Sequence, residues 1–268
     1  MSFADFHTHT IFSDGESTVR EMIDAARAKK LVALGLSDHS YTSFDPSYCM
    51  SPEAEELYRN EVREAQKIAL EEHGFPVLLG IEWDYRSTVD PAKYDYTVGS
   101  VHNVFKNGEP YSVDESAPSQ EKTIKEVFGG NTLDFVKSYF EDLVLHAEQN
   151  RPTFIGHFDL PSKYGLIDEE SPAYLAVARE AMAEILKHVS LFEVNTGAMA
   201  RGLRAVPYPA RTLLADLLRF GGKVILSSDA HSKENIAYRF EDAVALLKEI
   251  GFTKRSILTK EGVLEVAL

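Results

Sequence analysis

Six of the nine histidines in this 268-residue chain come at or just after the ends of predicted β-strands. Short β-branched runs alternate with amphipathic stretches along the chain, and the apolar runs close on polar side chains that can bind a metal. In a barrel of parallel strands the carboxyl ends of all strands converge on one face, so residues far apart in sequence meet there. The six histidines are His7, His9, His39, His102, His157 and His231.

The alternation of elements predicts repeated βα units and therefore an α/β fold. We expect strands over residues 3–8, 31–37, 77–83, 96–101, 153–156, 191–194 and 223–226, with helices between them. Seven strands are too many for a small open sheet and favour a TIM-like (β/α)7 barrel. Residues 256–259 form only a weak eighth strand pattern. At roughly 150 residues per domain, the length allows one large domain or two small ones. The barrel favours a single domain over residues 1–268.

Local patterns mark some of the connections. Thr18 and Glu21 form a capping box, which predicts the start of a helix. Residues 103–120 have no clear periodicity apart from a turn signal at Asn107-Gly108. This segment is long for a βα connection, and loops of that length are often functional.

Pairs of potential metal ligands stand two residues apart at both ends of the chain. His7 and His9 lie on one predicted strand, where alternation points both imidazoles the same way, as in a chelate. Asp229 and His231 repeat this spacing, and Glu82 adds a carboxylate from a third strand. Imidazole with carboxylate suits zinc, iron or manganese, and the absence of cysteine here argues against a closed structural zinc site.

Other histidines and acids have structural interpretations. His73 and His146 lie in predicted helices and His188 at a helix end, so we assign all three to structural or surface roles. Asp38 stands beside a strand-end histidine and could either bind a metal or orient an imidazole. Asp14, taken by itself, has the pattern of a turn or cap residue.

The charge balance limits the partners of the chain. Acidic residues outnumber lysine and arginine by 42 to 28, so the molecule repels polyanions unless a local field reverses this. We therefore expect neither long nucleic acid nor a membrane as a partner. The sequence has one cysteine, no secretion signal and no run of about 20 apolar residues. These features predict a cytoplasmic protein and leave its oligomeric state open.

Six short motifs resemble the ordered motifs of the polymerase and histidinol phosphatase (PHP) superfamily. They span residues 7–231, most of the chain, and their order and separations make the resemblance highly specific. The motifs are His7-Thr8-His9, Ser37-Asp38-His39, Gly80-Ile81-Glu82, Ser100-Val101-His102, Gly156-His157 and Ser228-Asp229-Ala230-His231.

The resemblance implies a distorted seven-stranded βα barrel that holds two or three divalent metal ions, with Zn, Mn or Fe as the candidates. Carried over motif by motif, it implies three ligand sets, of which the first two share Glu82 as a bridge. It also makes Asp14 a ligand rather than a turn residue. The sets are His7, His9, Glu82 and Asp229 for one metal, Glu82, His102 and His157 for a second, and Asp14, His39 and His231 for a third.

Several features resemble the histidinol-phosphatase branch of the superfamily. The length fits a stand-alone phosphatase, residues 80–85 resemble the third motif of the branch, and residues 108–114 resemble its substrate loop. Residues 193–197 are similar to its sixth strand, although the arginines that follow lie further along the chain than in the family. The implied phosphate contacts are Arg201, Arg204 and Lys163.

These resemblances imply a metal-dependent phosphatase for a small phosphate monoester, with L-histidinol phosphate, an intermediate of histidine biosynthesis, as the expected substrate. A metal-bridging hydroxide would attack phosphorus. Asp229, His231 or a water would then give a proton to the leaving alkoxide. Asp114 is the first candidate to bind the amine or imidazole of the substrate, ahead of Glu115 and Glu109.

Two other functions stay open on the sequence alone. The chain could be a phosphoesterase of the same superfamily that acts on another small phosphate ester, a nucleotide or an oligonucleotide end. The acidic balance and the lack of a basic aromatic stripe weigh against long nucleic acid. The chain could instead be a non-catalytic metal-binding module.

Overall fold

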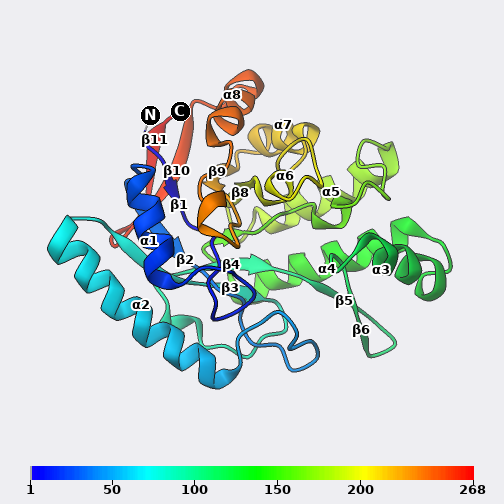
Figure 1. The fold of residues 1–268 in the computed structure, drawn as a ribbon. Coiled ribbons are helices and arrows are strands. Elements are labelled where there is room, and N and C mark those ends of the chain that lie inside the picture. Colours follow the sequence, from blue (N-terminus) through cyan, green and yellow to red (C-terminus); the bar gives the residue numbers. More distant parts are fainter. Residues whose placement is uncertain (1) are drawn as a thin grey trace.

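Parallel strands follow one another in chain order around a curled sheet (Figure 1). The computed structural model describes residues 2–268. Seven strands pair in parallel, β10 joins them beside β9, and β11 runs antiparallel to β10 at the edge. The strands of this sheet are β1 (Ala4–Asp5), β2 (Ala33–Leu36), β3 (Val77–Asp84), β4 (Tyr96–Ser100), β7 (Phe154–Ile155), β8 (Leu191–Asn195), β9 (Lys223–Ser227), β10 (Lys254–Thr259) and β11 (Gly262–Ala267).

The first and the seventh strand of the parallel set, β1 and β9, are joined just beyond their carboxyl ends. Thr8 forms a parallel bridge with Ala230, and the backbone N–H of His9 donates to the Ala230 carbonyl at 2.9 Å. Below this bridge, the buried carboxylate of Asp5 accepts hydrogen bonds from the backbone N–H and the hydroxyl of Ser228. These contacts close the sheet into a barrel. The expected α/β fold with a distorted TIM-like (β/α)7 barrel is confirmed.

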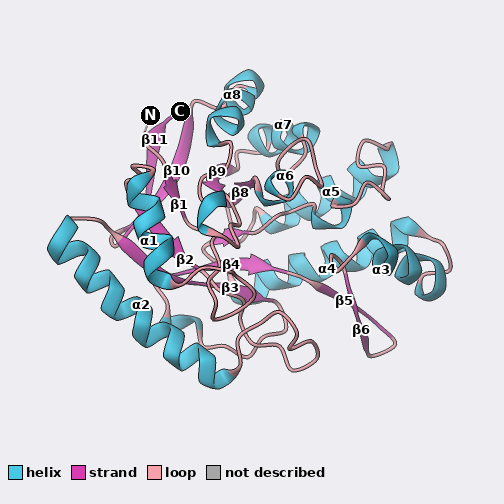
Figure 2. Ribbon diagram, viewed as in Figure 1, coloured by secondary structure: helices cyan, strands magenta, loops and turns pink. Residues whose placement is uncertain are grey.

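Helices cover the outside of the sheet (Figure 2). The capping box of Thr18 and Glu21 is present and starts the first helix. Among residues 2–268, no helix is long and apolar enough to cross a membrane. The helices are α1 (Val19–Ala28), α2 (Pro52–His73), α3 (Ala117–Lys122), α4 (Thr132–Asn150), α5 (Pro172–Ile185), α6 (Gly197–Ala200), α7 (Arg211–Arg219) and α8 (Phe240–Ile250).

Alternate residues of the strands form an apolar plug inside the barrel. On β3, Leu78 belongs to this plug, and alternation then turns Gly80 and Glu82 to the same inner side further along the strand. The interior is therefore apolar near the start of the strands and polar near their carboxyl ends. The plug consists of Ala4, Phe6, Ala33, Leu78, Tyr96, Val98, Phe154, Leu191, Ile225 and Leu258.

The connection over residues 103–120, which shows no clear periodicity in the sequence, contains a β-hairpin. Strands β5 (Asn103–Lys106) and β6 (Glu109–Ser112) pair antiparallel and extend away from the barrel (Figure 1). Asn107 and Gly108 form the predicted turn, and their φ angles of 55° and 87° suit a two-residue hairpin loop. Four-residue strands are too short to produce a recognisable alternation in the sequence.

The two ends of the chain also differ from expectation. Strand β1 has two residues instead of the six expected, because after Asp5 the chain leaves the regular ladder. The weak pattern at residues 256–259 belongs to a true strand, β10, which pairs with β11 along its whole length. Pairing with the following strand, which no local pattern reveals, stabilises β10.

The Tyr96 ring fills the space that two glycines leave inside the barrel. A Cβ added at Gly80 would lie 2.2 Å from the ring, and one at Gly35 would lie 2.2 Å from the hydroxyl. The Tyr96 hydroxyl donates to the Phe6 carbonyl at 2.8 Å, so the ring cannot move away without losing this hydrogen bond.

We expect Gly80→Ala to lower the free energy of unfolding by roughly 1–3 kcal/mol, the usual cost of overpacking a core. Urea denaturation of chelator-treated protein measures this loss. In a Tyr96→Leu background, which removes the ring, the same substitution should cost less. An equal loss in both backgrounds would mean that the ring is not the obstacle.

Candidate metal centre

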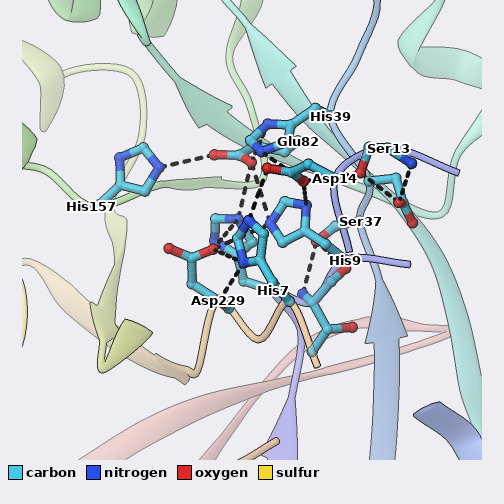
Figure 3. Close-up of polar contacts among 12 residues, drawn as sticks. His7, His9, Ser13, Asp14, Ser37, His39, Glu82, His157 and Asp229 are labelled. Carbon is cyan, nitrogen blue, oxygen red and sulfur yellow. Dashed lines mark hydrogen bonds and ion pairs between the residues drawn. The ribbon is translucent and has the colours of Figure 1, made fainter. Parts of the chain in front are cut away.

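The carboxylate of Glu82 lies at the centre of a cluster of imidazoles (Figure 3). Its Oε2 atom is 2.8 Å from Nδ1 of His39 and 3.2 Å from Nε2 of His7. Its Oε1 atom is 2.9 Å from Nε2 of His157 and 3.3 Å from Nε2 of His102. Because each oxygen faces a different pair of imidazoles, this carboxylate can bridge two metal ions.

Asp229 borders the cluster on a second side. Its Oδ1 atom is 3.2 Å from Nε2 of His9 and 3.9 Å from Nε2 of His7. Its Oδ2 atom accepts a hydrogen bond from Nη2 of Arg201 at 3.1 Å. A Cβ at Gly197 would lie 2.8 Å from Cβ of Asp229, so only glycine permits this close approach.

Asp14 borders the cluster on the side nearest to solvent. Its Oδ2 atom is 3.2 Å from Nε2 of His231. Its Oδ1 atom is 3.6 Å from Nε2 of His39 and 3.8 Å from Nδ1 of His9. The sequence alone favoured a turn residue here, whereas the resemblance implied a ligand, and the structure places the carboxylate among the imidazoles.

All nine residues expected as metal ligands lie in this one cluster. Three groups within it have potential ligand atoms less than 4.8 Å apart, and these groups differ in part from the expected sets. His9 belongs to two groups, and His39 rather than His157 joins Glu82 and His102. The groups are His7, His9 and Glu82; His39, Glu82 and His102; and His9, Asp14, His39 and His231.

Buried ligand atoms without a hydrogen-bond partner test whether the residues fit a metal. Nε2 of His7, both ring nitrogens of His9 and Oε2 of Glu82 are buried and have no such partner. A buried polar atom left unpaired costs about 1–3 kcal/mol, and a bound cation would supply the missing partner. The donor set of imidazoles and carboxylates, with no thiolate, fits zinc, manganese or iron. The cluster therefore fits divalent metal ions.

The electrostatics of Glu82, Asp229 and His9 favour the protonation states that metal binding needs. Burial opposes ionisation of Glu82, but the imidazoles of His39 and His7 hold its pKa well below the usual range. Burial also opposes ionisation of Asp229, whose pKa the Arg201 guanidinium nevertheless holds well below its usual range. Burial and neighbouring imidazoles lower the pKa of His9 to about 3. Charged carboxylates and a neutral His9 result, as ligands require.

Two carboxylates behind the cluster were given no role by the sequence. Glu193 accepts a hydrogen bond from Nδ1 of His7 at 2.8 Å. Asp84 accepts one from the backbone N–H of His102 at 3.1 Å and lies 3.4 Å from its Nδ1 atom. Both are charged residues in mostly apolar strands. Their position two residues from another inward polar residue was the signal that could have identified them.

Asp38 neither lies among the ligand groups nor orients an imidazole, so both expectations for it were wrong. Its carboxylate accepts hydrogen bonds from the backbone N–H and hydroxyl of Thr10 and from the same two groups of Ser13. Burial raises its pKa to about 6 despite these hydrogen bonds. Asp38 thus fixes the loop that carries Asp14.

A cavity of about 700 Å³ opens above the cluster, a size that suits a small molecule. Three of the residues expected to bind substrate line it, namely Arg201, Lys163 and Asp114, and Glu115 lines it too. Lys163 donates to Oδ2 of Asp114 at 2.7 Å. Burial opposes ionisation of Asp114, but Lys163 lowers its pKa to about 2. The two residues expected at opposite ends of the substrate are therefore an ion pair.

Arg204 does not line the cavity, so the structure does not bring it to the position expected for a phosphate contact. Its guanidinium makes two hydrogen bonds to the carboxylate of Glu169, at 2.8 and 3.2 Å, and others to Ser162. It also packs over the ring of Tyr208. These bonds engage both terminal nitrogens of Arg204. Glu109, on β6, is exposed and is not among the residues that line the cavity.

The three histidines assigned to structural roles lie outside the cluster. His146 is fully buried on α4, where Nε2 donates to the Trp83 carbonyl at 2.8 Å and Nδ1 accepts from Asn150 at 2.8 Å. His73 ends α2, and His188 follows α5. The structural interpretation of His146 is confirmed.

Comparison with known proteins identifies relatives of this chain. The PHP domain family model matches residues 5–197. A probable histidinol-phosphatase from Deinococcus radiodurans is 28% identical over 261 residues, which cover 92% of this chain and 93% of the relative. A probable histidinol-phosphatase from Schizosaccharomyces pombe is 27% identical over 198 residues. That match covers 69% of this chain but only 63% of the relative, less than two thirds of its length.

A solved structure shares the fold. Histidinol phosphate phosphatase from Lactococcus lactis, in complex with zinc, L-histidinol and phosphate, superposes with a TM-score of 0.70. The match covers 98% of this chain and 99% of the other, at 21% sequence identity. At this identity the likeness shows that the two proteins have the same barrel.

The buried His146 predicts a specific loss of stability in acid. Burial lowers its pKa from 6.5 to about 4, so the folded protein disfavours the protonated ring. Stability should therefore fall as the pH drops from about 6.5 to about 4, with His146 accounting for on the order of 3 kcal/mol. His146→Gln should flatten this part of the curve of unfolding free energy against pH, measured in urea on chelator-treated protein. Parallel curves for the two proteins would contradict the low pKa.

Proposed function

Because this chain belongs to the PHP domain family, we propose that it is a metal-dependent phosphatase that hydrolyses L-histidinol phosphate to L-histidinol and phosphate. The family and the names of the relatives support a phosphoric monoester hydrolase. The observation that carries the proposal is the convergence of imidazoles and carboxylates from separate strand ends beneath a cavity of about 700 Å³.

The cavity offers both charges that this substrate needs. A phosphate monoester is a dianion, and Arg201 and Lys163 are the arginine and lysine among the cavity-lining residues. The other end of L-histidinol phosphate carries an amine and an imidazole, which carboxylates bind. Asp114 and Glu115 lie on the same wall of the cavity as Lys163 and can bind the amine and imidazole end of the substrate.

The chain's own residues can position the ester and move the proton. When bound at the cluster, divalent ions neutralise phosphate charge and lower the pKa of water. Arg201 holds phosphoryl oxygens from the side of Asp229, to which it already donates at 3.1 Å. Asp229 and His231 both line the cavity and are the candidates to protonate the leaving alkoxide. Burial opposes protonation of His231, but its contact with Asp14 leaves its pKa raised.

A panel of phosphate esters tests the proposed function. Purified protein loaded with Mn²⁺, Zn²⁺ or Fe²⁺ should release phosphate from L-histidinol phosphate with a higher kcat/KM than from nucleoside monophosphates or p-nitrophenyl phosphate. Removal of metal with a chelator should abolish turnover, and the metal should restore it. Turnover of nucleotides alone would favour another ester as substrate. Turnover of no ester would favour a metal-binding module.

Asp114→Asn tests recognition of the cationic end of the substrate. Loss of the charge should raise KM for L-histidinol phosphate about tenfold or more, because charge-assisted hydrogen bonds contribute about 1.5–3 kcal/mol. KM for p-nitrophenyl phosphate, which has no amine, should change little. Glu109→Gln, at an exposed carboxylate on β6, is the matched control. Equal effects on both substrates would mean that Asp114 acts through Lys163 on the phosphate instead.

A further inference from the structure

Glu193 is a fully buried carboxylate that receives four hydrogen bonds. Its Oε2 atom accepts from Nδ1 of His7 at 2.8 Å and from the hydroxyl of Ser227 at 2.5 Å. Its Oε1 atom accepts from the backbone N–H of His157 at 2.5 Å and from the side-chain amide of Asn195 at 2.7 Å. Each oxygen thus has two donors, so Glu193 has no lone pair left for a metal ion. It supports the cluster from below without being a ligand.

We propose that Glu193 is the positioning residue that fixes the tautomer of His7 and holds the two sides of the metal cluster at their proper separation. An ionised carboxylate only accepts hydrogen bonds, so Nδ1 of His7 must carry the proton. The lone pair of the neutral ring is then on Nε2, which is buried, unpartnered and 3.2 Å from Oε2 of Glu82. Hydrogen bonds of this kind orient metal-binding histidines and raise their affinity for the ion.

The same carboxylate joins three segments that carry candidate ligands. It binds the ring of His7 beyond β1 and the backbone of His157 beyond β7. Through Asn195, whose amide is 2.7 Å from Glu193 and 3.4 Å from Oδ2 of Asp229, it also reaches the segment beyond β9. His7 and Asp229 lie on one side of Glu82 and His157 on the other. Glu193 therefore sets the spacing between the two sides.

Glu193→Gln is the sharpest test because it keeps the size of the side chain. The new amide has one oxygen and one NH₂ group, whereas four donors face the position. If the NH₂ group faces His7, the ring must give up the proton on Nδ1 and carry it on Nε2, which removes the lone pair that faces Glu82. If it faces His157, an N–H of the new amide points at the backbone N–H of His157, and neither group can accept a hydrogen bond. Both arrangements should weaken metal binding.

The expected result is a 10- to 100-fold weaker Zn²⁺ affinity of Glu193→Gln, the usual effect of losing such a support. Competition with a chromophoric chelator measures this affinity, and elemental analysis gives the number of ions bound. The matched control is Asp216→Asn, which removes another buried carboxylate, one that pairs with Arg179 and Arg219 away from the cluster. The control should bind Zn²⁺ as the wild type does.

A second measurement does not depend on whether the variant folds. In wild-type protein labelled with ¹⁵N-histidine, NMR should show His7 protonated on Nδ1, both without metal and with Zn²⁺. Protonation on Nε2 alone, with Nδ1 unprotonated, in the metal-free protein would overturn the inference. So would a Zn²⁺ affinity of Glu193→Gln within twofold of the wild type, or an equal loss of affinity in Asp216→Asn.

The inference rests on the proposed metal-dependent function, and the two can fail separately. If the wild type binds Zn²⁺ and Glu193→Gln binds it equally well, only the role of Glu193 is refuted. If the wild type binds none of Zn²⁺, Mn²⁺ or Fe²⁺, the proposed function fails as well.

Discussion

The ionised carboxylate of Glu82, 1% exposed and surrounded by imidazoles, is the interaction on which the rest of the site depends. A charge buried this deeply is stable only if neighbouring groups compensate it. The compensating rings come from segments that follow four different strands, β1, β2, β4 and β7. The cluster can therefore exist only in the closed barrel, and the apolar plug below it fixes which strand residues point inward.

The charges around the cavity show why an acidic chain needs metal ions to hold a phosphate ester. Arg201 is paired with Asp229, and Lys163 is paired with Asp114. Each cation that lines the cavity is thus largely neutralised by a carboxylate of the same wall. A formal net charge of −14 adds no attraction for a dianion. In the proposed reaction the positive field must come from bound divalent ions. Arg201 and Lys163 then orient the phosphate group.

The sequence predicted the parts of the molecule that follow from local pattern. The alternation of β-branched runs with amphipathic stretches identifies all seven barrel strands. The convergence of their carboxyl ends brings together residues such as His9 and Asp229, whose Nε2 and Oδ1 atoms are 3.2 Å apart. The sequence pattern could not reveal pairings of side chains that depend on tertiary contacts. Arg204 bonds Glu169 and Asp38 bonds Ser13, and each pairing satisfies a charge with a partner on a separate loop. No spacing rule distinguishes such an arginine from one that faces a phosphate.

Burial alone does not separate a metal-binding histidine from a structural one, because His7 and His146 are both fully buried. The difference lies in their nitrogens. Both ring nitrogens of His146 have hydrogen-bond partners in the core, so the ring is satisfied as a neutral group. In His7 only Nδ1 is bonded, to Glu193, and Nε2 faces carboxylate oxygens that cannot donate to it. A buried imidazole with one nitrogen held and the other facing acceptors is incomplete without a proton or a cation. Several such rings around one carboxylate cannot all be protonated cheaply, which leaves metal ions as the partner that completes them.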